Sequence, residues 1–325
     1  MANTNLLVLA PPDHPGLQAL EPLRAHSELC ISDDAAELAR RIPHAEVLLI
    51  TGLGAPLDLP GLWRQARSVR WIHSLSAGVE KLLFPELLES PVVVTNARGV
   101  FKRSLAEFAV LGILFHTKKV RRLVDNQRER RWDHFLVDWA NERAMGVLGY
   151  GEIGRECALL AKGLGLKIYA VRRNTGKSAE DPLLDRIFAP GQLHEMLSQI
   201  DVLLCAAPLT SETHHMVSDA EFGVMRPNAI VINVGRGPVI DESALIRALK
   251  SARIAAASLD VFEHEPLPAD SPLWQMDNVL ISPHCTDETE DPDWLDLTLR
   301  VFLENFDRFQ RAEPLLNVVD KKAGY

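Results

Sequence analysis

The sequence predicts an α/β protein built from two doubly wound parallel-sheet domains. Its 325 residues are enough for about two domains with sizeable cores. Short apolar runs rich in β-formers alternate with segments of helical spacing, which is typical of parallel strands joined by crossover helices. A glycine-rich turn between an apolar strand and a helix lies near mid-chain, at residues 146–154.

The composition is that of an ordinary globular protein, with 47% hydrophobic and 24% charged residues. The net charge of −9 argues against a nucleic-acid-binding or anionic-membrane surface. The apolar runs 6–10 and 108–115 are too short for a signal peptide or a membrane span, so we expect a cytoplasmic protein. The cysteines show no paired motif, which favours reduced thiols over disulfides or a metal site; they are Cys30, Cys157, Cys205 and Cys285.

The first part of the chain alternates predicted strands and helices. Apolar runs at 6–10, 47–50, 70–74 and 92–95 predict buried strands, and residues 34–41 have helical spacing. The turn Ser76-Ala77-Gly78-Val79 follows the third of these strands. Its backbone N–H groups can hold a small anion, or the turn can simply reverse the chain, and both interpretations stay open.

A capping box, Ser104 to Glu107, predicts the start of a long amphipathic helix that runs to about Arg130. Its later half, 118–131, is dense in arginine and glutamate, which is more typical of a solvated helix face than of a nucleic-acid patch. Residues 132–144 are less regular and lead into the glycine turn.

The glycine turn has the spacing of a dinucleotide-binding loop, G-x-G-x-x-G. The first glycine permits the tight turn, the second lets a pyrophosphate approach the backbone, and the third lets the helix pack on the strand. The helix that follows, predicted at 155–163, offers free N–H groups and a partial positive charge to phosphates. We therefore expect the whole loop to bind a cofactor: Gly149, Tyr150, Gly151, Glu152, Ile153 and Gly154.

The alternation continues after the loop. Strands are predicted at 167–171, 201–206, 229–234, 255–259 and 279–282, and helices at 242–251 and 294–310. This order predicts a Rossmann domain over residues 99–286. The last helix is expected to return to the first domain, which then comprises 1–98 and 287–325.

The end of the second strand of this domain bears on the choice of cofactor. NAD-binding Rossmann domains carry an acidic residue about 20 positions after the loop, where it binds the ribose hydroxyls. Here the strand ends Val171-Arg172-Arg173-Asn174, with two arginines and no acid. Because arginine accommodates a 2′-phosphate, Arg172 and Arg173 predict NADP(H) as the preferred cofactor, with NAD(H) as the alternative. A pair of exposed strand-end arginines is the competing interpretation.

Polar residues that can carry chemistry follow the later strands. They occur in four stretches, which are Ala207 to Thr213, Ile232 to Gly237, Leu259 to Pro266 and Ser282 to His284. Open α/β sheets bind ligands at the carboxyl ends of their strands. The side chains expected to converge on one crevice beside the nucleotide are Arg236, Asp260, Glu265 and His284.

These motifs, in this order, resemble those of the D-isomer-specific 2-hydroxyacid dehydrogenases, which include glyoxylate/hydroxypyruvate reductases, D-lactate dehydrogenases and phosphoglycerate dehydrogenases. The resemblance covers nearly the whole chain, from the Ser76 turn and Thr95-Asn96 to Asn317–Asp320 and Gly324-Tyr325. It implies a flavodoxin-like substrate-binding domain, an active site in the cleft between the domains, and a homodimer paired through the nucleotide-binding domains. The implied reaction is the reduction of a small 2-oxo acid to the D-2-hydroxy acid, for which Arg172 and Arg173 predict NADPH as the cofactor.

The resemblance also implies a role for each matching residue. The family's catalytic arginine, glutamate and histidine match Arg236, Glu265 and His284. Asp260 is implied to contact the nicotinamide carboxamide, and the backbone of Ala77 and Gly78, with Arg236, to bind the substrate carboxylate. The strand-end residues that complete the cofactor site are Ala207, Pro208, Val234 and Gly235.

The chemistry of the three catalytic candidates fits these roles. A guanidinium at Arg236 can hold the carboxylate of a 2-oxo acid and polarise its ketone. His284 can protonate the ketone oxygen as hydride arrives, and remove that proton in the reverse reaction. Glu265 can orient the imidazole and favour its protonated form. On spacing alone Glu263 competes for the acidic role, and the order of the motif favours Glu265.

The chain departs from the family after His284, where Cys285-Thr286-Asp287-Glu288 stands in place of the small residues of many members. This wall of the pocket is expected to be more polar, which leaves glyoxylate, hydroxypyruvate and larger 2-oxo acids as candidate substrates. Two alternative functions remain. The first is a dinucleotide-sensing, corepressor-like interaction protein, which the complete catalytic set disfavours. The second is an NAD-linked dehydrogenase of a larger or phosphorylated 2-hydroxy acid, which the missing strand-end acid disfavours.

Overall fold

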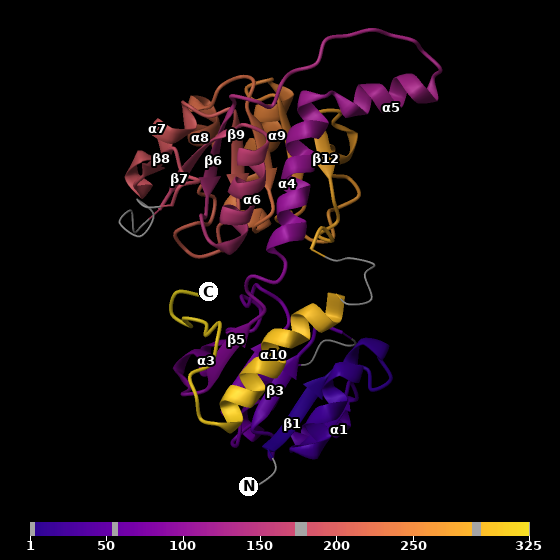
Figure 1. Cartoon of the computed structure of the whole chain (residues 1–325), viewed down its shortest axis with the longest axis vertical. Coiled ribbons are helices and arrows are strands. Elements are labelled where there is room, and N and C mark those ends of the chain that lie inside the picture. Colours follow the sequence, from indigo (N-terminus) through magenta and orange to yellow (C-terminus); the bar gives the residue numbers. More distant parts are fainter. Residues whose placement is uncertain (1–3, 54–57, 173–180, 288–293, 325) are drawn as a thin grey trace. The chain divides into compact units, whose positions relative to one another are not determined.

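The computed structural model describes residues 4–53, 58–172, 181–287 and 294–324, and it divides into two compact units. The first unit comprises Met1–Val100 and Thr289–Tyr325, and the second comprises Phe101–Glu288. Within the described ranges, each unit is built on one parallel sheet, of five strands in the first and seven in the second (Figure 1). The predicted fold class is confirmed. The predicted domain limits, 98/99 and 286/287, stay a proposal that limited proteolysis can test.

The sheet of the first unit has the strand order β2-β1-β3-β4-β5, which is that of flavodoxin-like folds. Its strands are β1 (Thr4–Leu9), β2 (Ser27–Ser32), β3 (Val47–Ile50), β4 (Trp71–Ser74) and β5 (Val93–Asn96). Its helices are α1 (Ala35–Arg41), α2 (Leu59–Leu62), α3 (Pro85–Glu89) and α10 (Trp294–Gln310), with 3₁₀ helices at Pro15–Ala25 and Trp63–Gln65.

Helix α10 packs on the sheet of the first unit (Figure 1). Its Phe302 and Phe306 are fully buried, and the Phe302 ring stacks on Trp71 of β4 with the centroids 5.3 Å apart. The tail that follows runs along β5, where the Val319 N–H donates to the Val94 carbonyl at 2.8 Å. The end of the chain therefore belongs to the core of the first unit.

The sheet of the second unit has the order β12-β11-β10-β9-β6-β7-β8, which is the Rossmann order with a seventh strand at one edge. The strands are β6 (Ala144–Leu148), β7 (Lys167–Val171), β8 (Arg186–Phe188), β9 (Val202–Cys205), β10 (Ile230–Asn233), β11 (Ala256–Leu259) and β12 (Val279–Ile281). The helices are α4 (Lys102–Thr117), α5 (Val120–Arg128), α6 (Glu152–Gly163), α7 (Leu193–Leu197), α8 (Asp219–Val224) and α9 (Glu242–Lys250), with 3₁₀ helices at Pro190–Gln192, Gly237–Val239 and Pro272–Gln275.

Helices cover both faces of this second sheet. Helices α4 and α6 lie side by side on one face (Figure 1). Helices α7, α8 and α9 pack on the other, where Met196, Phe222 and Leu245 are buried with Leu203 and Val231 of the sheet. The strand order reverses between β6 and β9, and open α/β sheets bind ligands beyond the carboxyl ends of the strands at such a point.

The prediction of one helix from Ser104 to about Arg130 was wrong in two respects. Helix α4 begins at Lys102, so Ser104 lies inside its first turn and its hydroxyl donates to the Thr286 carbonyl. The helix ends at Thr117, because Lys119 adopts a left-handed backbone (φ 54°) before α5 begins. Strands β2 and β8 were not predicted, since the first is partly polar and the second is three residues long.

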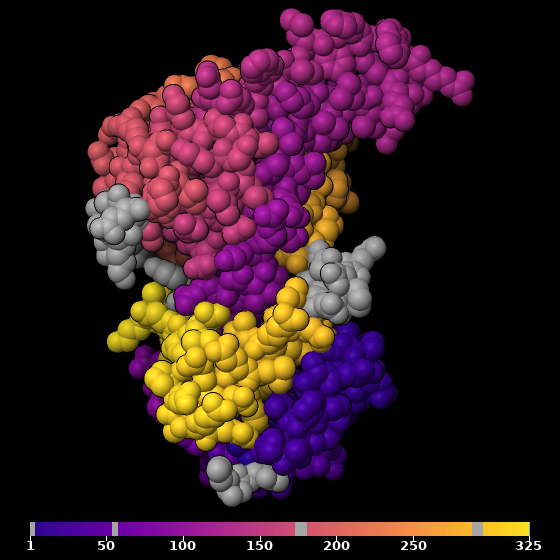
Figure 2. Space-filling model, viewed as in Figure 1, coloured from indigo at the N-terminus to yellow at the C-terminus, as the bar shows by residue number. Residues whose placement is uncertain are grey.

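Helix α5 and the residues that follow it, to 143, form an arm whose outer part stands away from the rest of the second unit (Figure 2). Its inner part contacts that unit, where Arg121 Nη2 donates to the Val279 carbonyl at 3.0 Å. The chain that follows α5 stays in contact with this helix, since Arg122 of α5 pairs with Asp133 at 2.6 Å. Large apolar side chains of the arm are nevertheless exposed, Trp132 fully, Leu136 by 79% and Trp139 by 75%. Such a concentration of exposed apolar surface is typical of an interaction site.

Candidate active site

The glycine loop of the second unit has the geometry that its spacing requires. Gly149 follows β6 with φ of +92°, which glycine adopts without strain, and a side chain there would overlap the backbone of Ala206 and Ala207. At Gly154 a Cβ would overlap the Gly149 carbonyl oxygen and lie 2.9 Å from Cγ1 of Val147. The turn and the helix packing therefore require both glycines.

Gly151 differs from the other two glycines of the loop, because no described residue beyond its chain neighbours has an atom within 4 Å of where its Cβ would be. It precedes α6, whose first N–H groups have no partner within the helix. Open space in front of a helix N-terminus fits the pyrophosphate of a dinucleotide. The residues present thus fit a nicotinamide dinucleotide, which when bound supplies or accepts the hydride.

A second set of contacts lies beside the loop, at the end of β7. The Arg172 guanidinium carbon is 5.6 Å from the centre of the Tyr150 ring. The Tyr150 hydroxyl donates to Asp181 at 3.1 Å, and Arg155 Nε donates to the same carboxylate at 2.8 Å. Burial, followed by the charge of Asp181, raises the pKa of Tyr150, so its hydroxyl stays a donor. Arg173 lies outside the described residues.

The other predicted site residues of this unit follow the carboxyl ends of adjacent strands. Ala207 and Pro208 follow β9, Val234, Gly235 and Arg236 follow β10, Asp260 follows β11, and His284 follows β12. Because these four strands are neighbours in one parallel sheet, the residues share one edge of it. Arg236 is partly buried there, and its Nη1 donates to the Gly235 carbonyl at 2.7 Å.

His284 and Glu265 form a hydrogen-bonded pair at this edge. His284 Nδ1 lies 2.7 Å from Glu265 Oε2, and the other oxygen, Oε1, accepts from the Phe262 N–H at 3.0 Å. The carboxylate is thus held at both oxygens, and it fixes the plane of the imidazole. The two side chains are 39% and 34% exposed, and no described residue hydrogen-bonds Nε2, so this nitrogen is free to meet a substrate.

Asp260 holds the turn that follows His284. It is 1% exposed, and its Oδ1 accepts from the N–H groups of Cys285 and Thr286, each at 3.3 Å. Its Oδ2 accepts from the Thr286 hydroxyl at 2.7 Å. The Ser104 hydroxyl of α4 donates to the Thr286 carbonyl. Cys285 and Thr286, two of the residues that depart from the family pattern, therefore tie the turn to β11 and α4.

The predicted anion-binding turn belongs to the first unit, where it follows β4. Asn96 Nδ2 donates to the Ala77 carbonyl at 2.5 Å, and the Ala97 N–H donates to the Ser76 carbonyl at 3.3 Å. Within the ranges that the structure describes, the N–H groups of Ala77 and Gly78 make no hydrogen bond. Two adjacent donors in a turn held by its carbonyls suit a small carboxylate.

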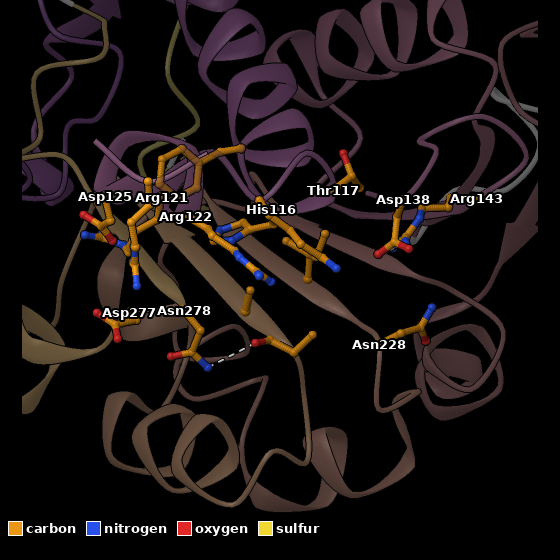
Figure 3. Close-up of a pocket in the computed structure, with 16 residues that line it drawn as sticks. His116, Thr117, Arg121, Arg122, Asp125, Asp138, Arg143, Asn228, Asp277 and Asn278 are labelled. Atoms are coloured by element: carbon orange, nitrogen blue, oxygen red, sulfur yellow. Dashed lines mark hydrogen bonds and ion pairs between the residues drawn. The ribbon is translucent and has the colours of Figure 1, made fainter. Parts of the chain in front are cut away.

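A cavity of about 470 Å³ in the second unit lies elsewhere, at the amino ends of β10, β11 and β12. Figure 3 shows its charged and polar lining, which includes His116 of α4 and Arg121, Arg122 and Asp125 of α5. Burial lowers the pKa of His116 to about 4, so its imidazole is neutral. None of the predicted site residues lines this cavity, and the sheet separates it from the carboxyl edge.

A group of polar side chains behind the Glu265 loop was not predicted from the sequence. Glu263 Oε1 accepts from the Glu242 N–H at 3.2 Å, and Glu242 Oε2 accepts from the Glu263 N–H at the same distance. His215 Nε2 lies 2.6 Å from Glu263 Oε1. Glu265, and not Glu263, therefore contacts His284. Asp181 and Arg155 were missed as well, since neither pairing has a signature in the spacing of the sequence.

A doubly wound sheet with a glycine loop at its switch point, and a histidine–carboxylate pair at its carboxyl edge, define the class of dinucleotide-dependent oxidoreductases. Residues 110–286 match the family model described as D-isomer specific 2-hydroxyacid dehydrogenase, NAD binding domain. The chain belongs to this family of oxidoreductases, as its motifs predicted.

Individual relatives cover most of the chain. A glyoxylate reductase of Thermococcus gammatolerans is 31% identical over 82% of each protein. A glyoxylate/hydroxypyruvate reductase B of Yersinia enterocolitica is 32% identical over 80% of each. The crystal structure of a D-isomer specific 2-hydroxyacid dehydrogenase from Xanthobacter autotrophicus, in complex with NADPH and MES, is 29% identical over 100% of both chains, with a TM-score of 0.83.

Two features are absent from the residues that the structure describes. No helix there is long and apolar enough to cross a membrane. No group of three or more His, Cys, Asp or Glu side chains there is placed to hold a metal ion.

Proposed function

We propose that the protein reduces a small 2-oxo acid, glyoxylate or hydroxypyruvate, to the D-2-hydroxy acid with NADPH. The observation that carries the proposal is the 2.7 Å contact between His284 Nδ1 and Glu265 Oε2, on the sheet edge that also bears Arg236. The names of the relatives at 31% and 32% identity support the substrate class.

Each of the three side chains has a part in this reaction. Arg236 binds the substrate carboxylate and polarises the ketone. His284 Nε2 gives its proton to the ketone oxygen while the carbon takes up hydride, which leaves a hydroxyl group and a neutral imidazole. Glu265 keeps the ring oriented through Nδ1 and stabilises the imidazolium before the transfer.

The preference for NADPH rests on Arg172. Its guanidinium lies against the Tyr150 ring of the glycine loop, where a cation can bind a 2′-phosphate. The NADPH complex of the relative at 29% identity supports the same cofactor. Arg172→Ser is expected to raise the KM for NADPH about tenfold and leave that for NADH unchanged, while Arg186→Ser, on β8, changes neither. Better turnover of the wild type with NADH would overturn this preference.

Enzyme activity is tested by following NADPH consumption against a panel of 2-oxo acids, with NADH in parallel. His284→Ala should lower kcat by about 100-fold or more, because it removes the general acid, while the Kd for NADPH stays near the wild-type value. An active variant would show that the acid has been misassigned. A wild-type protein that binds NADPH but turns over no acid would instead favour the dinucleotide-sensing alternative.

We also propose that two copies pair through the second unit, with the arm of residues 120–143 in the interface. The exposed Trp132, Leu136 and Trp139 support this role. Light scattering with size exclusion should give a dimer, and Trp132→Glu should weaken it. Trp274→Glu is the matched control, because Trp274 is 51% exposed but lies outside the arm. A monomeric wild type would contradict the proposal.

A further inference from the structure

The loop that carries Glu265 is anchored by a group of three side chains on its far side. Glu263 and Glu242, the first residue of α9, each accept a hydrogen bond from the other's backbone N–H, both at 3.2 Å. His215 closes the group, with Nε2 at 2.6 Å from Glu263 Oε1. Glu263 is thus bound from two separate segments, the helix and the 207–217 loop, although its side chain is 23% exposed.

The same loop also rests on the backbone beside Arg236. A Cβ at Gly237 would overlap the carbonyl group of Phe262 and lie 2.5 Å from the Glu263 nitrogen. The loop therefore contacts the Arg236-Gly237 segment directly. Glu263 and Glu265 lie on the same loop, and this loop touches the segment that carries Arg236. A shift of Glu263 therefore moves backbone that bears one catalytic candidate, Glu265, and contacts the segment of another, Arg236.

The charges in this group oppose and offset one another. Burial raises the pKa of Glu242; the charge of Glu263 adds to this effect, whereas the Glu263 N–H and the charge of His264 lower it. His215 faces Glu263 from the other side, with the His214 ring stacked on it at 4.0 Å between centroids. The hydrogen bond between His215 and Glu263 and the amino end of α9 offset the repulsion between the two carboxylates. Without the Glu263 side chain the loop loses its contact with His215 and the hydrogen bond from the Glu242 N–H of α9; without His215 it loses the first of these.

We propose that Glu263, held by His215 and Glu242, is a positioning residue of the reductase that keeps Glu265 on Nδ1 of His284. This inference rests on the function proposed above. Glu265 lies two residues after Glu263, and its Oε1 is held by the N–H of Phe262, on the other side of Glu263. A displacement of about 1 Å at a group that orients the acid is enough to slow a reaction substantially.

The test compares steady-state kinetics, pH–rate profiles and thermal unfolding of variants. Glu263→Ala is expected to lower kcat for 2-oxo acid reduction about tenfold, with the Kd for NADPH within about twofold of wild type. The alkaline limb of its pH–rate profile should move to lower pH, because Glu265 is then no longer held on Nδ1 of His284. Glu263→Gln keeps an oxygen for the Glu242 N–H, so it should recover part of kcat.

His215→Asn repeats the test from the other partner, since asparagine tolerates the left-handed backbone of this position (φ 51°) but is too short to reach Glu263. If Glu263→Ala does not fold, His215→Asn tests the proposal instead. Asp219→Ala is the matched control, because it removes another ion pair to α9, that with Arg247 at 2.6 Å, which involves no residue of the Glu265 loop. This control should lose little stability and keep both kcat and the pH profile.

The outcomes separate the two proposals. Lower kcat with a shifted alkaline limb in Glu263→Ala and His215→Asn supports the positioning role. Variants that unfold at lower temperature but keep kcat and the pH profile would overturn it, since the group would then be structural only. A wild type without turnover of any 2-oxo acid would refute the proposed function itself, and the positioning role with it.

Discussion

Alanine substitution at each glycine of the G-x-G-x-x-G loop should separate the structural from the cofactor-binding positions. At Gly149 the positive φ costs about 1–2 kcal/mol for alanine, and the added methyl overlaps the backbone of residues 206–207. At Gly154 the methyl enters a packed contact, which costs about 1–3 kcal/mol. Gly151→Ala meets no described atom, so it should cost less than about 1 kcal/mol as a change of N-cap.

These free energies convert into melting temperatures of the cofactor-free protein. For a unit of this size, 1 kcal/mol shifts Tm by about 2–4 °C, so Gly149→Ala should lower Tm by about 2–8 °C from the positive φ alone, and Gly154→Ala by about 2–12 °C. Gly151→Ala should stay within about 3 °C of the wild type. Its methyl group instead occupies the space in which the pyrophosphate lies, so the Kd for NADPH should rise at least about tenfold, or about 1.4 kcal/mol.

Thermal unfolding by circular dichroism and NADPH titration by fluorescence measure the two effects separately. Gly163→Ala, near the other end of α6, is the control, since a Cβ there also meets nothing within 4 Å and lies away from the loop. It should change neither the Kd nor the activity. Gly151→Ala with wild-type affinity for NADPH would refute the placement of the pyrophosphate at this loop.

Three further predictions concern single residues. His73 is fully buried, which lowers its pKa to about 3, whereas its pKa in the unfolded chain is about 6.5. As the pH falls, the unfolded state therefore takes up the proton first and is favoured. Urea unfolding should give a free energy of unfolding about 2 kcal/mol lower at pH 5 than at pH 7.5. Thr286→Val leaves Asp260 Oδ2 without its donor and should cost about 1–3 kcal/mol in the free energy of unfolding, whereas Thr286→Ser should keep it. Arg236→Lys keeps the charge but loses the planar fork, so steady-state kinetics should show KM for the 2-oxo acid raised about tenfold.

Each has its own control. In His73→Gln the difference in stability between the two pH values should shrink, since no imidazole titrates at that position; an unchanged difference would assign it to other groups. Equal stabilities of Thr286→Val and Thr286→Ser would show that the hydroxyl bond to Asp260 contributes nothing. For Arg236→Lys, a changed Kd for NADPH with an unchanged KM for the acid would place this residue at the cofactor instead.

The regular elements whose residues are buried by their own unit could be predicted closely. Strands β3 and β7 and helix α10 have the limits that their apolar patterns predict. The break between α4 and α5 could not be predicted, because Lys118-Lys119 carries neither glycine nor proline and only the left-handed backbone at Lys119 ends the helix. The Ser104–Glu107 motif misled for a related reason, since a serine inside a helix can bond elsewhere, here to the Thr286 carbonyl.

By itself, the sequence determined the doubly wound class, the glycine loop and the placement of Arg236, Asp260 and His284 after strands, because local periodicity and chain order are enough to set these. The order of the motif favoured Glu265 over Glu263 as the partner of His284, but only the tertiary structure shows the contact itself. It also decided that Asp260 is engaged by Thr286, and that Glu263 is held by His215 and Glu242. Those contacts join different strands, helices and loops, so the packing of the second unit sets their distances, and no spacing along the chain records them.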